Sequence, residues 1–281
     1  MTYIPLTRCA ALAYAARAQT RPRPGTIVPV RAAKLAHHLL GMEAEARLTH
    51  IAVLDDEVLL DVMTVLDLYA DGPYVLWHDT ISGFAEDVLG LTLTDTQRAA
   101  LEAVVAPDAC RAAVRAPYPD NELLAAVLMV WVVLARCSRR MPQVAVSSEA
   151  WFGAGRSLWR VIARFVDNAS LPGSLDLRAR AWHQSDRGGA RWLAAFAVCT
   201  TDPYAFAGLP PYAIVVSDAS RISDPGGRAV LEHLDLVAYS RNRLVALAGD
   251  EQPEEWFTQY AARPDVTAVD AGDTTAGGDA T

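Results

Sequence analysis

Lysine is almost missing from this chain: Lys34 is the only one among 25 basic residues, and all the others are arginines. A lysine that holds phosphate in a glycine-rich loop therefore has a single candidate, and Lys34 lies in a helical pattern without such a loop. Cysteine is scarce as well, and the four residues Cys9, Cys110, Cys137 and Cys199 lie far apart. Because no Cys/His pair has the spacing of metal ligands, we expect no metal and no other cofactor.

Long apolar runs are also lacking. The longest extends from Leu123 to Cys137, short of the roughly 20 residues that cross a bilayer, so it predicts a buried helix. No basic segment is followed by an apolar run and a small-residue cleavage site, so we expect no secretory signal. The sequence therefore predicts a cytoplasmic protein without membrane contact.

Positive charge is in deficit, with a net charge of −8 and a pI near 5.2. This balance argues against a surface that binds nucleic acid throughout, because phosphate contacts need clustered basic residues. A local basic patch that binds nucleic acid is still possible, and the alternative is that these arginines form a solvated helix face. The arginines considered for such a patch are Arg136, Arg139, Arg140, Arg156, Arg160 and Arg164.

Two patterns divide the chain. Residues 1–72 predict a small helical region, with helices over Leu6–Arg17, Arg31–Gly41 and Asp55–Tyr69. From Pro73 to Asp265, helices alternate with short β-rich runs, which predicts βα units and a mainly parallel sheet flanked by helices. Residues 266–281 have no apolar periodicity and predict a disordered tail.

The predicted elements of the second region can be given by residue range. The expected strands are Ala112–Arg115, Gln143–Ser148, Leu177–His183, Trp192–Val198, Ala213–Ser217 and Leu244–Ala248. The expected helices are Asp95–Val105, Asn121–Arg136 and Arg156–Asn168. His183 and Asp186 precede Gly188-Gly189, which indicates a hairpin turn.

Several segments of this region resemble, in the same order, the ATPase domain of the large subunit of phage terminases. They are Trp77–Gln97, Ala112–Leu134, Gln143–Trp151, Leu158–Arg160, Thr201–Gly208, Tyr212–Ile222 and Leu244–Asp250 with Trp256-Phe257. The resemblance implies a P-loop-NTPase-like α/β fold and a phage or prophage origin. After Asp265 no acidic metal cluster follows, so we expect no terminase nuclease domain.

The resemblance also implies where a nucleotide would bind. Gln97 matches a glutamine that reads adenine, and Arg115 matches an arginine that senses nucleotide; a structural ion pair is the alternative for Arg115. The triplet Asp120-Asn121-Glu122 stands where the family has Gly-Lys-Thr. Ser217-Asp218 stands where a strand should end in Asp-Glu, so Asp218 matches the Glu position.

These replacements predict a vestigial site without catalytic residues. A phosphate loop needs convergent backbone N–H groups, a lysine and a metal-binding hydroxyl. Pro117 and Pro119 each remove a backbone donor, and the carboxylates of Asp120 and Glu122 repel a triphosphate. We therefore expect a catalytically inactive, terminase-like scaffold or regulatory subunit with a protein partner.

Two alternatives stay open at this point. A divergent ATPase would use Gly155-Arg156-Ser157, which resembles a Gly-Lys-Ser triplet between a strand and a helix, together with Asp218. Against it, Trp151 and Phe152 would crowd the phosphates. The other alternative is an accessory protein that binds DNA through the arginines named above.

Overall fold

A computed structural model describes 13 segments of the chain. They are residues 30–69, 74, 77–106, 109–136, 144–148, 155–185, 191–199, 213–217, 219–223, 225, 227–228, 243–249 and 255–271. The chain divides into two compact units. The first comprises Met1–Thr92, Trp131–Met141 and Arg164–Pro172; the second comprises Leu93–Val130, Pro142–Ala163 and Gly173–Thr281. This division differs from the predicted boundary between residues 72 and 73.

The described part of the first unit is helical. Its complete helices are α2 (Val30–Leu40), α3 (Ala44–Ala52), α4 (Asp56–Tyr69) and α5 (Ile81–Asp87). α2 packs on α4 and buries Ala32, Ala36 and Leu39, which recur at helical spacing on one face. The predictions for α2 and α4 are confirmed, α3 and α5 were not predicted, and Leu6–Arg17 lies outside the described residues.

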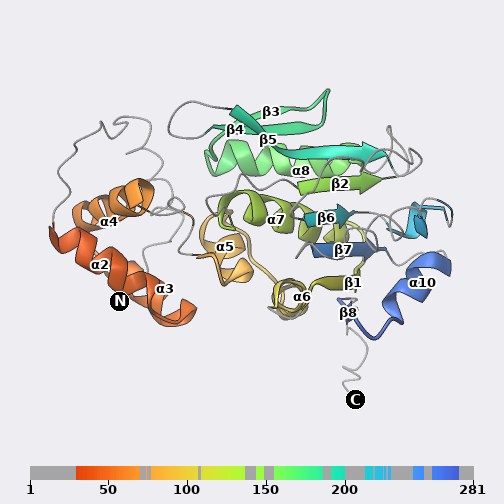
Figure 1. The fold of residues 1–281 in the computed structure, drawn as a ribbon, viewed down its shortest axis with the longest axis horizontal. Coiled ribbons are helices and arrows are strands. Elements are labelled where there is room, and N and C mark those ends of the chain that lie inside the picture. The colour runs from red at the N-terminus through yellow and green to blue at the C-terminus, as the bar shows by residue number, and fades with distance from the viewer. Residues whose placement is uncertain are drawn as a thin grey trace, which may run out of the picture. The chain divides into compact units, whose positions relative to one another are not determined.

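The second unit contains an eight-stranded sheet in the order β3-β4-β5-β2-β6-β7-β1-β8 (Figure 1). Its strands are β1 (Arg111–Arg115), β2 (Val144–Ser148), β3 (Ser174–Asp176), β4 (Ala181–Ser185), β5 (Arg191–Cys199), β6 (Ala213–Val216), β7 (Arg243–Ala248) and β8 (Thr267–Asp270). Parallel pairings join all neighbours from β5 to β8. β3, β4 and β5 pair antiparallel.

Five predicted strands are confirmed and two predictions are corrected. The expected strand Leu177–His183 is misplaced, because residues 177–180 form a turn in which Asp176 Oδ1 accepts hydrogen bonds from the backbone N–H groups of Arg178 and Ala179. The tail prediction from residue 266 is wrong at its start, because Thr267–Asp270 forms β8 and pairs with β1. The residues of β8 alternate between half-buried and exposed, so its sequence contains no apolar run that would predict a strand.

Burial explains why the central strands read as continuous apolar runs. Every residue of β6 and β7 is buried, as expected for parallel strands that are covered on both faces. On one face, Ile214, Leu244 and Ala246 pack in a cluster with the helix α10 (Glu255–Ala261). Trp256 of α10 is the largest side chain of this cluster.

Three long helices belong wholly or partly to the second unit: α6 (Asp95–Val105), α7 (Asp120–Leu134) and α8 (Gly155–Asn168). Every residue of α7 from Leu124 onward is buried, which confirms the prediction of a core helix. None of the helices in the described part of the chain is long and apolar enough to cross a membrane. The predicted fold class is confirmed: a mainly parallel α/β sheet with flanking helices.

Candidate functional site

Some of the predicted site residues follow the carboxyl ends of β6, β7 and β1. These strands are parallel neighbours, so the residues that follow them lie at one edge of the sheet, where open α/β sheets bind ligands. Ala116 N donates to Ala248 O at 2.9 Å, and Gly249 N donates to Ser220 Oγ at 3.3 Å. A Cβ atom at Gly249 would lie 3.8 Å from Asn121 Nδ2, which places Asn121 at the same edge.

The loop from β1 to α7 has few backbone donors to offer. Asn121 N donates to Pro117 O at 3.1 Å, and Leu123 N donates to Pro119 O at 3.1 Å. Glu122 N donates to Asn121 Oδ1 at 2.8 Å. Pro117 and Pro119 have no N–H, so most amides from residue 116 to residue 123 are either absent or already bonded within the protein.

The acidic residues of this loop differ in their surroundings. Asp120 is half-buried at the first position of α7, where the helix dipole favours a carboxylate. Glu122 is 5% exposed, and its Oε1 accepts a hydrogen bond from the Ser157 hydroxyl. Ser157 is the third residue of α8, so the structure joins residues from both predicted phosphate loops.

The remaining predicted site residues are less closely connected. Ser217, directly after β6, is 1% exposed, and its hydroxyl has no hydrogen-bond partner within the described segments. Asp218 lies outside the described residues. Arg115 is exposed at the end of β1, and its backbone oxygen accepts a hydrogen bond from Ala271 N at 2.7 Å. The ion pair considered for Arg115 does not occur in the part of the chain that the structure describes.

Gln97 has a structural role that was not predicted from the sequence. Thr94 N donates to Gln97 Oε1 at 2.9 Å, and Gln97 N donates to Thr94 Oγ1 at 3.2 Å. The two residues form a capping box at the start of α6. The amide oxygen of Gln97 is therefore engaged at the helix terminus.

We predict that Gln97→Ala lowers the free energy of unfolding by about 1 kcal/mol, because an N–H group at the start of α6 loses its partner. Gln97→Glu should change it little, since a carboxylate accepts the same hydrogen bond and suits the first helical turn. Urea denaturation followed by circular dichroism measures both. Equal losses in the two variants would contradict the capping role.

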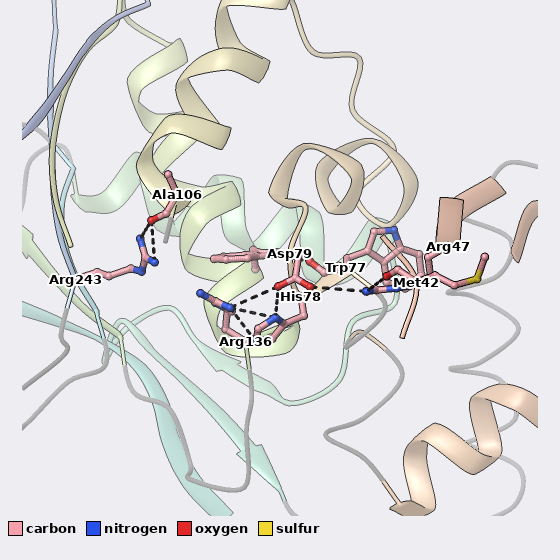
Figure 2. Close-up of polar contacts among 9 residues, drawn as sticks. Met42, Arg47, Trp77, His78, Asp79, Ala106, Arg136 and Arg243 are labelled. Atoms are coloured by element: carbon pink, nitrogen blue, oxygen red, sulfur yellow. Dashed lines mark hydrogen bonds and ion pairs between the residues drawn. The ribbon is translucent and has the colours of Figure 1, made fainter. Parts of the chain in front are cut away.

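A charged network in the first unit was not predicted. His78 Nδ1 lies 2.6 Å from Asp79 Oδ1, and His78 Nε2 lies 2.9 Å from an Arg136 guanidinium nitrogen. Figure 2 shows Arg136 and Arg47 reaching Asp79 from opposite sides, at 4.0 Å and 3.7 Å.

This network removes Arg136 from the set of arginines considered for DNA. Its guanidinium lies 5.2 Å from the centroid of the Trp131 ring and is only 17% exposed. Burial favours a higher pKa for Asp79, but the hydrogen bond with His78 and the charges of His78, Arg47 and Arg136 hold that pKa below its usual value. No periodicity could have revealed this network, because residues 78 and 136 belong to distant segments.

Asp87 lies in the same unit, and its pKa is shifted in the opposite direction from that of Asp79. Burial raises its pKa to about 6, although the indole of Trp77 donates to Oδ2 at 3.0 Å. A raised pKa means that folding favours the protonated carboxyl. The resulting stabilisation is complete below the ordinary pKa of 3.8 and is lost as pH rises through about 6.

We therefore expect Asp87→Asn to remove a fall in stability between about pH 4 and pH 6, because asparagine stays neutral and still accepts from Trp77. Denaturation midpoints measured across this range test it. Asp79→Asn serves as the opposite case: its effect should disappear as pH falls below about 4. An unchanged pH profile in Asp87→Asn would contradict the assignment.

Comparison with known proteins adds a decisive observation about the fold. Neither a protein-family model nor a curated protein matches the chain. Two solved structures of the large terminase ATPase domain of Thermus phage P74-26 do, one of them an arginine-to-alanine variant. Each has 14% sequence identity, a TM-score of 0.52, and coverage of 67% of this chain and 84% of that chain.

The fold is similar to that of a phage terminase ATPase domain. This confirms, at the level of the fold, the resemblance seen in the motifs. At 14% identity, the similarity to the terminase domain concerns the arrangement of strands and helices. The chemistry of the site has to be argued from the residues of this chain.

Proposed function

We propose that this protein is a catalytically inactive, terminase-like protein of phage or prophage origin that acts as a scaffold or regulatory subunit in DNA packaging. The observation that carries the proposal is the state of the loop between β1 and α7. The amides of Asn121, Glu122 and Leu123 all donate within the chain, and two neighbouring positions are prolines. A triphosphate would need those same donors.

Charge strengthens the argument from the loop. Glu122 is a buried carboxylate, and Asp120 starts the same helix. Two unit charges about 4 Å apart repel by roughly 1 kcal/mol in water and about 4 kcal/mol in a partly screened site. A triphosphate carries several charges, so binding beside these carboxylates is opposed more than once.

The motif at the end of β6, Ser217-Asp218, also differs from that of an active site. An active terminase-like site needs a carboxylate at the end of β6 to hold the metal and its water shell. Ser217 occupies that position and carries no charge. Lys34, the single lysine, lies on α2 in the first unit and is no part of the β1–α7 loop.

The proposed role follows from combining this fold with an inactive site. A chain with the strand arrangement of a packaging ATPase can dock where such a domain docks without consuming nucleotide. We infer a protein partner, such as a subunit of an active packaging complex. This step is an analogy at the level of the fold.

A thermal-shift series with ATP, ADP and Mg²⁺ tests the proposal. A nucleotide at roughly 100 times its Kd stabilises its target by about 2.7 kcal/mol, which shifts the melting temperature by several degrees. We expect no shift beyond that of an equal concentration of salt. A shift that grows with micromolar nucleotide would refute the inactive site.

The alternative of a divergent ATPase makes a separate prediction. It requires Arg156 and Ser157 to hold phosphate, and it predicts phosphate release from ATP that Arg156→Ala abolishes. The hydrogen bond from Ser157 to Glu122 opposes it, because the hydroxyl that would bind Mg²⁺ already faces a carboxylate of the same chain. We expect no phosphate release from the unaltered protein or from the Arg156→Ala variant.

The DNA-binding alternative rests on fewer arginines than the sequence offered. Arg160 and Arg164 are exposed on α8, whereas Arg136 is engaged with His78 and Trp131. Arg139 and Arg140 lie outside the described residues. Retention on DNA that weakens with salt would support this alternative, and no retention at low salt would end it.

A further inference from the structure

Two histidine side chains from different helices meet in the first unit. His38 lies in the last turn of α2, and His50 lies in the last turn of α3. Their ring centroids are 6.5 Å apart, and the planes of the two rings are nearly perpendicular, at 80°. Both residues are exposed, so the pair presents two imidazoles at one place that solvent and small ions reach.

A hydrogen bond determines which nitrogen of His50 is available to a ligand. His50 Nδ1 donates to Ala46 O at 3.0 Å, because a carbonyl oxygen can only accept. The neutral ring then keeps its lone pair on Nε2. Histidines that bind metals commonly donate their second nitrogen to a backbone carbonyl, which fixes the ring and makes the ligating nitrogen more basic. His50 therefore has the arrangement of a metal ligand that binds through Nε2.

The ends of both helices favour a cation beside this pair. The carboxyl end of a helix carries a partial negative charge from the helix dipole. α2 ends at Leu40 and α3 ends at Ala52, so each histidine lies within the last turn, where this charge acts. Among the residues that the structure describes, no group of three or more His, Cys, Asp or Glu side chains could hold a metal. The pair would therefore supply two ligands, and water would supply the others.

We propose that His38 and His50 form a two-ligand site for a transition-metal ion such as Zn²⁺ or Ni²⁺, and that the ion joins α2 to α3. Imidazole nitrogen suits these ions, whereas Mg²⁺ prefers oxygen ligands. Zinc lies about 2 Å from an imidazole nitrogen, so one ion bridges the two rings once these exposed side chains turn their nitrogens toward it. The sequence could not reveal the pair, because ligands on two helices have no characteristic spacing. The site is independent of the proposed inactive nucleotide site.

Calorimetric titration of the full chain, without a histidine tag, tests the proposal. Zn²⁺ and Ni²⁺ are added in a buffer that does not chelate metals, and Mg²⁺ serves as the oxygen-preferring comparison. We expect Zn²⁺ and Ni²⁺ to bind through the two histidines and Mg²⁺ not to bind them. Affinity should fall from about pH 7.5 to about pH 5.5, because a proton and a metal compete for the same imidazole nitrogen.

His38→Phe separates coordination from the ring contact, because phenylalanine keeps an edge-to-face contact and has no ligating nitrogen. His37→Phe is the matched control, since it makes the same change at a neighbouring exposed residue of α2. Loss of a group that supports a metal ligand already lowers affinity by about 10- to 100-fold. We therefore expect His38→Phe and His50→Gln each to weaken zinc binding at least about tenfold, and His37→Phe to leave it unchanged.

The nitrogen NMR signals of the histidine side chains show which atom binds. Zn²⁺ should shift the Nε2 signal of His50, while Nδ1 keeps its hydrogen and its bond to Ala46 O. A shift at neither His38 nor His50 would overturn the proposal, whatever the total zinc bound elsewhere in the chain.

The variants also distinguish a shared ion from two separate ones. Two histidines that bound ions independently would each lose one ion on replacement and leave the affinity of the other unchanged, which would contradict a shared site. Unchanged zinc affinity in folded His38→Phe, or an equal loss in His37→Phe, would contradict it too. Circular dichroism without metal checks folding, and His38→Gln is judged by the same comparison if His38→Phe does not fold.

Discussion

Replacing Arg243 with methionine is expected to lower the free energy of unfolding of the second unit by about 4 kcal/mol. Arg243 is 7% exposed at the start of β7, and its guanidinium donates to the carbonyl oxygens of Val104, Ala106 and Ala109. Figure 2 shows the contact with Ala106. These carbonyls lie at and just beyond the end of α6, where a cation is favourable. Methionine fills similar space but leaves all three acceptors without this donor.

Arg160→Met is the matched control for this variant. Arg160 is exposed on α8, so its replacement should change stability by no more than about 0.5 kcal/mol. Urea denaturation followed by circular dichroism compares the two proteins. A similar small effect at both positions would show that Arg243 does not hold β7 against α6.

Trp256→Ala is expected to destabilise the second unit by a comparable amount, on the order of 4 kcal/mol. Trp256 is 1% exposed in the cluster on one face of the sheet, and its indole donates to Ile222 O at 2.8 Å. Its ring lies so close to Gly227 that a Cβ atom at that position would clash with the indole. Alanine would leave a large cavity beneath η2 (Ala219–Arg221), the turn that follows Ser217.

Trp256→Phe separates the ring from its hydrogen bond. Phenylalanine keeps most of the apolar volume and loses only the indole N–H, so a loss of about 1 to 2 kcal/mol is expected. If the alanine and phenylalanine variants were equally stable in urea, packing of the Trp256 ring would not be what holds α10 against the sheet.

The sequence was sufficient for most of the sheet and its long helices. The all-apolar strands β6 and β7 and the helix α7 follow from burial on both sides, which produces an unbroken apolar run. Short elements were missed for a physical reason. α5 and α10 each have seven residues, too few for a helical period to stand out, and β8 is a half-exposed edge strand.

The sequence could predict which residues lie at the candidate site, but not the contacts that they form. Residues that follow parallel strands must meet at one edge, so Asn121, Glu122 and Ser217 could be placed together from their order. The hydrogen bond between Glu122 and Ser157 could not be predicted, because it depends on how two helices approach each other in space. The role of Gln97 could have been read from the Thr-x-x-Gln pattern of a capping box, which competes with the interpretation as an adenine contact.

The most direct test of the central claim is an experimental structure determined with ATP or ADP and Mg²⁺ at millimolar concentration. The account predicts that the loop from Ala116 to Leu123 keeps its internal hydrogen bonds and that no nucleotide touches it. An ordered nucleotide bonded to the backbone of that loop would contradict the account.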